Sequence, residues 1–66
     1  MMELIQLYQI TYHNWGRKKK SPLMTLETAK AMVDFLNFQG AKRIKMETCG
    51  KAEGREINEG GYYKNY

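Results

Sequence analysis

Four consecutive cations beside a single tryptophan are the residues whose types and spacing most clearly suggest chemistry. Trp15 is followed by the run Arg17, Lys18, Lys19 and Lys20. Lysine and arginine bind phosphate oxygens, and an indole ring stacks on nucleobases. The run therefore predicts a nucleic-acid contact, which Arg43 and Lys45 extend from a later strand. The competing interpretation is a solvated charge run beside a tryptophan that packs against the core.

His13 and Cys49 are the two residues that resemble a base and a nucleophile. Both are expected near the carboxyl ends of parallel strands, where open sheets bind ligands. No third residue is placed to orient them, and a chain of 66 residues leaves little room for an enclosed pocket. Their spacing does not match a zinc signature either. We therefore expect no catalytic residue, no metal site and no cofactor.

Residues 26–39 carry a full set of helix signals, and the rest of the chain is expected to be arranged around them. Thr25 is suited to accept a backbone N–H at the helix start, and Glu27 adds negative charge to the first turn. Gly40 is suited to the left-handed conformation that ends a helix. Apolar residues at helical spacing predict one buried arc, formed by Leu26, Ala29, Met32, Val33 and Leu36.

Three apolar residues of this helix lie outside the buried arc. Ala31, Phe35 and Phe38 project toward its far side. One interpretation is that loops and the C-terminal tail cover them. The other is a surface for self-association or for a partner protein, because contiguous exposed apolar patches usually mark interaction sites.

Two strands are expected to flank the helix. Residues 3–13 are rich in β-branched and aromatic side chains, and residues 41–49 alternate between apolar and polar types. Ile5 and Leu7 lie on the face of the first strand away from the helix, where a second subunit would cover them. With one intervening helix, the strands are expected to run parallel through a right-handed crossover. Residues 14–24 are expected to form a long loop.

The predicted fold is therefore a small α/β (α+β) mini-domain: a βαβ unit with one helix packed on a small sheet. A turn over residues 50–54 and a possible short third strand over 55–59 complete a single domain that spans residues 1–59. Residues 60–66 form a tail rich in glycine and tyrosine. This tail is expected either to fray or to dock on a neighbouring surface.

Length and composition narrow the functional classes further. The chain has a net charge of +4, which permits contact with nucleic acid or with an acidic protein. A domain this small is marginally stable alone, and its single cysteine allows no intrachain disulfide, so oligomerisation is the expected stabiliser. The lone cysteine favours a reducing, cytoplasmic location. No apolar run is long enough to span a membrane, and the first residues do not resemble a signal peptide.

The sequence supports two functional hypotheses, neither of them enzymatic. The first is a homodimer that binds and modulates a larger protein. Small phage or mobile-element proteins that inhibit host enzymes or defence systems act in this way, and the analogy with them rests on overall composition alone. Its predicted contact residues are Ile5, Leu7, Ala31, Phe35, Phe38, Tyr62, Tyr63 and Tyr66. The alternative is a nucleic-acid-binding accessory protein that uses Trp15 and the cations of residues 17–20.

Overall fold

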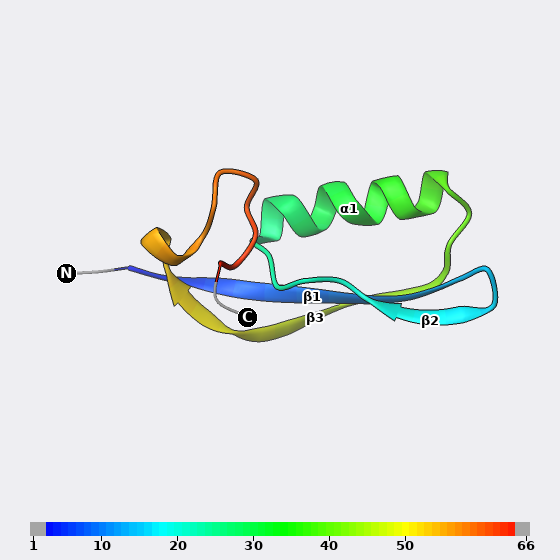
Figure 1. Ribbon diagram of the computed structural model, residues 1–66, viewed down its shortest axis with the longest axis horizontal. Helices are drawn as coiled ribbons and strands as arrows, with labels where there is room; N and C mark the ends of the chain where they lie inside the picture. The colour runs from blue at the N-terminus through cyan, green and yellow to red at the C-terminus, as the bar shows by residue number, and fades with distance from the viewer. Residues whose placement is uncertain (1–2, 65–66) are drawn as a thin grey trace.

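The protein is built from a three-stranded antiparallel sheet with one helix lying along one of its faces (Figure 1). The computed structural model describes residues 3–64. Its elements are β1 (Leu4–Asn14), β2 (Arg17–Lys20), α1 (Leu26–Phe38), β3 (Lys42–Glu53) and the short 3-10 helix η1 (Gly54–Glu56). The strand order is β2-β1-β3. This arrangement confirms the predicted α+β mini-domain with one helix on a small sheet. No helix within residues 3–64 is long and apolar enough to cross a membrane.

The expected parallel pairing of the two long strands is wrong, because a hairpin comes between them. β1 turns directly into β2, which pairs with it antiparallel. The chain then passes through α1 and enters β3, which also pairs antiparallel with β1. It follows that β2 and β3 run parallel to each other on opposite sides of β1. The βαβ unit is therefore present, but its first strand is β2.

Residues 17–20 form a strand and not part of a loop, because Trp15 and Gly16 make a tight hairpin turn. Asn14 pairs with Arg17, which leaves a two-residue loop between the strands. Both loop residues have positive φ, 56° at Trp15 and 75° at Gly16. That combination is the type I′ turn, whose twist matches an antiparallel hairpin. In Figure 1 this hairpin extends past the C-terminal end of α1.

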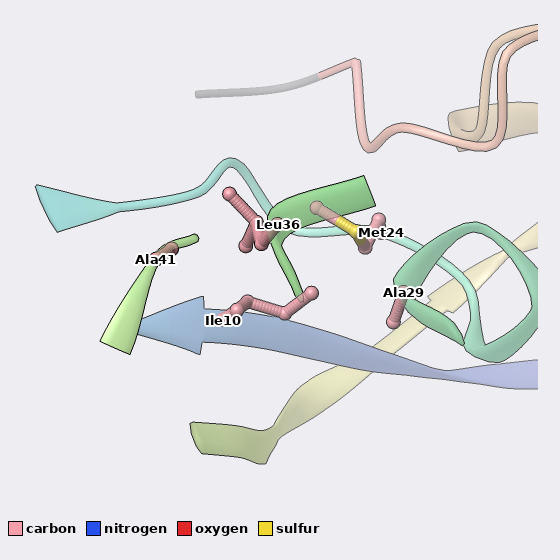
Figure 2. Packing of buried hydrophobic residues seen from close by; sticks show 5 residues of the cluster. All are labelled: Ile10, Met24, Ala29, Leu36 and Ala41. Carbon is pink, nitrogen blue, oxygen red and sulfur yellow. The ribbon is translucent and has the colours of Figure 1, made fainter. Parts of the chain in front are cut away.

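The core lies between α1 and β1. It is formed by Ile10, Met24, Ala29, Leu36 and Ala41, all buried (Figure 2). Ile10 of β1 points toward Leu36 of α1, and Met24 comes from the link between β2 and α1. Tyr8 and Tyr12 pack against this cluster from the same face of β1. The opposite face of the sheet is consequently free to carry polar residues.

The link between β2 and α1 continues the edge of the sheet beyond the end of β2. The backbone of Met24 exchanges two hydrogen bonds with that of Tyr8, at 2.7 and 2.9 Å. Ser21 is buried, and its Oγ accepts a hydrogen bond from the backbone N–H of Ile10 at 2.8 Å. This side chain contributes an acceptor just before Pro22, which has no N–H to offer the sheet.

The helix begins at the predicted residue and ends at Phe38, one residue before the predicted end, and Thr25 acts differently from expectation. The carbonyl of Thr25 accepts the first helical hydrogen bond from Ala29, but its hydroxyl bonds to that of Thr28 at 3.1 Å and caps no N–H. Gly40 has a φ of 85°, and the N–H of the next residue, Ala41, donates to the carbonyl of Leu36. This is the glycine-terminated helix end that the sequence predicts.

The predicted turn over residues 50–54 and the third strand over 55–59 are not formed. β3 continues through Gly50, where a bulge at a φ of 77° keeps the strand paired with β1 as far as Glu53. Residues 54–56 then form η1, which Glu53 and Glu56 cap reciprocally. Glycine is suited to the bulge because its φ is positive there. The strand that completes the sheet is β2 instead.

The C-terminal segment docks on the link before α1. The carbonyl of Gly61 accepts a hydrogen bond from the N–H of Thr25, and the N–H of Tyr63 donates to the carbonyl of Leu23. Asn58 shapes the preceding turn, since its Oδ1 accepts the N–H groups of Gly60 and Tyr62. Residues 60–64 are thus part of the folded unit. Tyr66, a predicted contact residue, lies outside the described residues.

Candidate nucleic-acid interface

The face of the sheet that points away from α1 carries a polar groove of about 300 Å³, here called the outer groove. All three strands contribute to it. Its walls are formed by Gln9, Thr11, Tyr12, His13, Lys18, Lys20, Arg43, Lys45 and Glu47. Lys18 and Lys20 come from the predicted cation run, and Arg43 and Lys45 are the predicted extension of it. The groove therefore gathers four of the predicted nucleic-acid contacts.

Strand register explains why these cations meet. Lys20 pairs with Thr11, and Thr11 pairs on its other side with Lys45. Residues directly opposite each other in a sheet point to the same face, so these three side chains form one row across the three strands. Strands lie about 4.8 Å apart, which places the Cα atoms of Lys20 and Lys45 roughly 10 Å from each other. Lys18 begins the next row, opposite His13.

The four consecutive cations do not act as one cluster, because a strand sends alternate side chains to opposite faces. Lys19 pairs with Tyr12, whose side chain packs toward the core, and Arg17 pairs with Asn14. Arg17 and Lys19 therefore lie on the helix side of the hairpin, where they are exposed. Of the predicted run, the outer groove receives Lys18 and Lys20.

Among residues 3–64, the four cations of the outer groove form no ion pair. Glu47 is the carboxylate among its lining residues. Within residues 3–64, the ion pair that forms is between Arg55 and Glu53, at 2.6 Å and at the other end of the sheet. The groove consequently presents a net positive charge to solvent, and positive charges concentrated in a groove attract polyanions.

Arg43 stands at a bulge in β3. Between the pairs Thr11–Lys45 and His13–Lys42, two residues of β3 oppose one residue of β1. Arg43 is one of the two and has a φ of 54°, in the left-handed region. A bulge changes the direction in which a side chain points. Arg43 lines the outer groove and also a second hollow at the end of the hairpin.

This second hollow, here called the tip hollow, has a volume of about 280 Å³. It is formed between the hairpin turn and the start of β3 by His13, Asn14, Trp15, Gly16, Gly40, Lys42 and Arg43. Trp15 is 90% exposed, so it does not pin a loop against the core as the competing interpretation expects. The tip hollow and the outer groove share His13 and Arg43 in their walls.

His13 and Cys49 are far apart, because antiparallel pairing places them at different ends of β1. His13 pairs with Lys42, whereas Cys49 lies in the bulge opposite Leu7. At about 3.4 Å per residue of strand, this separates them by roughly 20 Å. The expectation that both lie at one end of the sheet is wrong. Within the described part of the chain, no three His, Cys, Asp or Glu side chains gather into a metal-binding group.

The predicted protein-contact residues fall into separate places. Phe38 is 91% exposed and Phe35 is 54% exposed, and Ala31 is exposed beside them on α1. Leu7, by contrast, is 2% exposed within the single chain, so it needs no second subunit as a cover. Ile5 is half-buried near η1. Tyr62 packs on the core, and the hydroxyl of Tyr63 faces Glu56 at 3.5 Å.

Nine further residues line the groove or the hollow without having been predicted to bind nucleic acid. They are Gln9, Thr11, Tyr12, His13, Asn14, Gly16, Gly40, Lys42 and Glu47. The signal that would have found them is the hairpin register. Once Trp15 and Gly16 are recognised as a two-residue turn, β2 must lie beside the second half of β1.

Comparison of the chain with models of protein families, with curated proteins and with solved structures finds no match.

Proposed function

We propose that the protein binds nucleic acid through the outer groove, as a small accessory protein without catalytic activity. The observation that carries the proposal is the convergence of Lys18, Lys20, Arg43 and Lys45 from two strands on one face of the sheet. None of these four cations forms an ion pair with another of the described residues. They are therefore available for phosphate oxygens, which supply most of the affinity in nucleic-acid binding.

The shape of the sheet supports the same proposal. β-strands present regularly spaced side chains, and sheets and ribbons are established nucleic-acid-binding surfaces. α1 covers the opposite face, so the cationic face stays open (Figure 1). The hydroxyl of Thr11 adds a neutral hydrogen-bonding group between Lys20 and Lys45, and the Oε1 of Gln9 adds an acceptor beside Glu47, while the Nε2 of Gln9 donates to the carbonyl of Ser21. Such groups complement charged contacts to phosphate and sugar.

A pair of matched double variants tests the proposal. Lys18→Gln with Lys20→Gln removes two charges from the outer groove. Arg17→Gln with Lys19→Gln removes two charges from the helix side of the same strand. Both variants lower the net charge equally, and because all four side chains are exposed, both are expected to leave the sheet register unchanged. Binding to a fluorescently labelled single-stranded oligonucleotide is measured by anisotropy.

The outer-groove variant is expected to lose affinity and to reduce the slope of log K against log salt by about 1.4, since each phosphate contact to a single strand contributes about 0.7. The helix-side variant is expected to keep most of the affinity. Equal losses in both variants would mean that net charge alone attracts the oligonucleotide. Absence of binding by the unmodified protein would refute the proposal.

A second candidate function is self-association or binding of a larger protein through α1. The observation that favours it is the exposure of Phe35 and Phe38, with Ala31 next to them on the same side of the helix. Large exposed aromatic residues on a monomer usually mark contact sites. The two candidates are compatible, because a dimer formed through α1 leaves the opposite face of each sheet open. The single cysteine, which is exposed, supports placing either function in a reducing compartment such as the cytoplasm.

A further inference from the structure

The tip hollow combines an exposed aromatic ring with backbone strain. Among residues 3–64, the non-glycine residues with positive φ are Trp15 and Arg43, and both line this hollow. A left-handed backbone is unfavourable for residues with a Cβ atom, and such strain tends to collect at functional sites. Trp15 also gains nothing from burial, because it is 90% exposed. Neither the fold nor the core explains a tryptophan at this position.

The walls of the tip hollow offer groups suited to a nucleotide. The side chains of His13 and Asn14 form no hydrogen bond with the residues that the structure describes, although both residues are half-buried. Imidazole and amide groups bond to the edges of bases, and a guanidinium such as that of Arg43 stacks on their planes. Lys42 adds a cation for an adjacent phosphate. An aromatic ring, polar edges and cations thus surround one hollow of about 280 Å³.

We infer that the tip hollow binds one unpaired nucleobase, stacked on the indole of Trp15, while the neighbouring phosphates lie in the outer groove. The shared wall residues His13 and Arg43 place the hollow and the groove next to each other. A base inside a duplex is stacked on its neighbours and does not offer a free face to a side chain. The ligand class is therefore single-stranded nucleic acid or a single-stranded end. This inference rests on the proposed function of the outer groove.

Trp15 is the only tryptophan of the chain, so its fluorescence reports directly on the tip hollow. The protein is titrated with an oligothymidine and, separately, with the duplex that this strand forms with oligoadenosine. Stacking is expected to quench the fluorescence strongly with the single strand and little with the duplex. Trp15→Ala is expected to weaken single-strand binding by roughly five- to a hundredfold, the loss typical of one stacked base. Trp15→Phe, which keeps a ring, should restore most of that affinity.

Folding of each variant is checked by circular dichroism. Because Trp15 is exposed, its removal should leave the core intact. Equal affinity for single strand and duplex, with no quenching and no loss in Trp15→Ala, would overturn the base-stacking inference while the outer groove remains a phosphate-binding site. Absence of binding to both ligands would overturn the inference and the proposed function together. In the Lys18→Gln, Lys20→Gln variant, Trp15 fluorescence that is still quenched at saturating oligonucleotide would support binding of the base in the tip hollow, separate from phosphate binding in the outer groove.

Discussion

Trp15 and Arg43 face the same hollow from different elements, and both hold a left-handed backbone conformation. Trp15 has a φ of 56° in the turn between β1 and β2, and Arg43 has a φ of 54° in the bulge near the start of β3. Each such residue costs roughly 1–2 kcal/mol relative to an ordinary conformation. A protein of this size has little stability to spare. The turn and the bulge require these φ values, and the proposed base contact would account for a tryptophan and an arginine standing where glycine or asparagine would cost less.

Replacing Trp15 with Asn is expected to make the protein more stable and a weaker binder. Asn-Gly is the favoured pair for a type I′ turn, so the variant should raise the free energy of unfolding by about 1 kcal/mol. It also removes the ring that stacks on a base. Chemical denaturation measures the first effect, and anisotropy with an oligothymidine measures the second. A variant that is less stable than the unmodified protein would show that the indole contributes packing which its exposure hides.

Replacing Gly61 with Ala is expected to release the C-terminal segment and destabilise the protein. Gly61 has a φ of 85°, and an added Cβ atom would overlap the hydroxyl of Thr28. The backbone strain alone costs about 1 kcal/mol or more, and the overlap adds to it. Urea denaturation should show a lower midpoint.

Gly60→Ala is the matched control for that experiment. A Cβ atom at Gly60 would approach Asn58 and Tyr62 at 3.4 Å, a distance at which small adjustments suffice, and its φ is not positive. The control is expected to lose distinctly less stability than Gly61→Ala. Equal effects at the two positions would contradict the specific cost of the positive φ and of the overlap with Thr28 at Gly61.

Truncating Ile10 is expected to unfold much of the protein. This side chain is fully buried between β1 and α1, and it belongs to a core cluster of five buried residues (Figure 2). Ile→Ala substitutions in cores cost about 2–5 kcal/mol, whereas Ile→Val costs about 0.5–1.5 kcal/mol. Thermal denaturation of both variants should show a graded loss. A small effect from alanine would mean that the core rearranges to fill the cavity.

Replacing Phe35 and Phe38 with Ser tests the second candidate function. Sedimentation equilibrium of the unmodified protein is expected to show a dimer at micromolar concentrations, and the double variant is expected to be monomeric. Oligonucleotide affinity per chain should change little, because α1 covers the face opposite the outer groove. Glu27→Ser with Asn37→Ser alters exposed polar residues of the same helix and should leave the dimer intact. An unmodified protein that sediments as a monomer would contradict self-association through α1.

The sequence predicts α1 well because its signals are local. Apolar spacing, an acidic first turn and Gly40 as the terminating residue act within a few positions of one another. The fold class follows from the same helix and from the β-branched and aromatic composition of β1. Gly50 predicts a turn because glycine often interrupts strands, whereas the structure accommodates it in a bulge of β3.

β2 could not be predicted from composition, because lysine is a poor strand former and tryptophan is unusual in a type I′ turn. The presence of this strand changes the candidate site as well as the topology. A loop would let the cations of residues 17–20 act together, whereas a strand divides them between two faces. Lys20 and Lys45 lie in one row because both pair with Thr11. These pairs join residues distant in sequence, and local sequence signals do not specify them.

The measurement that tests the central claim most directly is the salt dependence of oligonucleotide binding by the unmodified protein. The dissociation constant for an oligothymidine is determined at several concentrations of potassium chloride. Four phosphate contacts, from Lys18, Lys20, Arg43 and Lys45, predict a slope of log K against log salt of about −3 for a single strand. A flat dependence, or no binding at low salt, would contradict the assignment of the outer groove as a nucleic-acid interface.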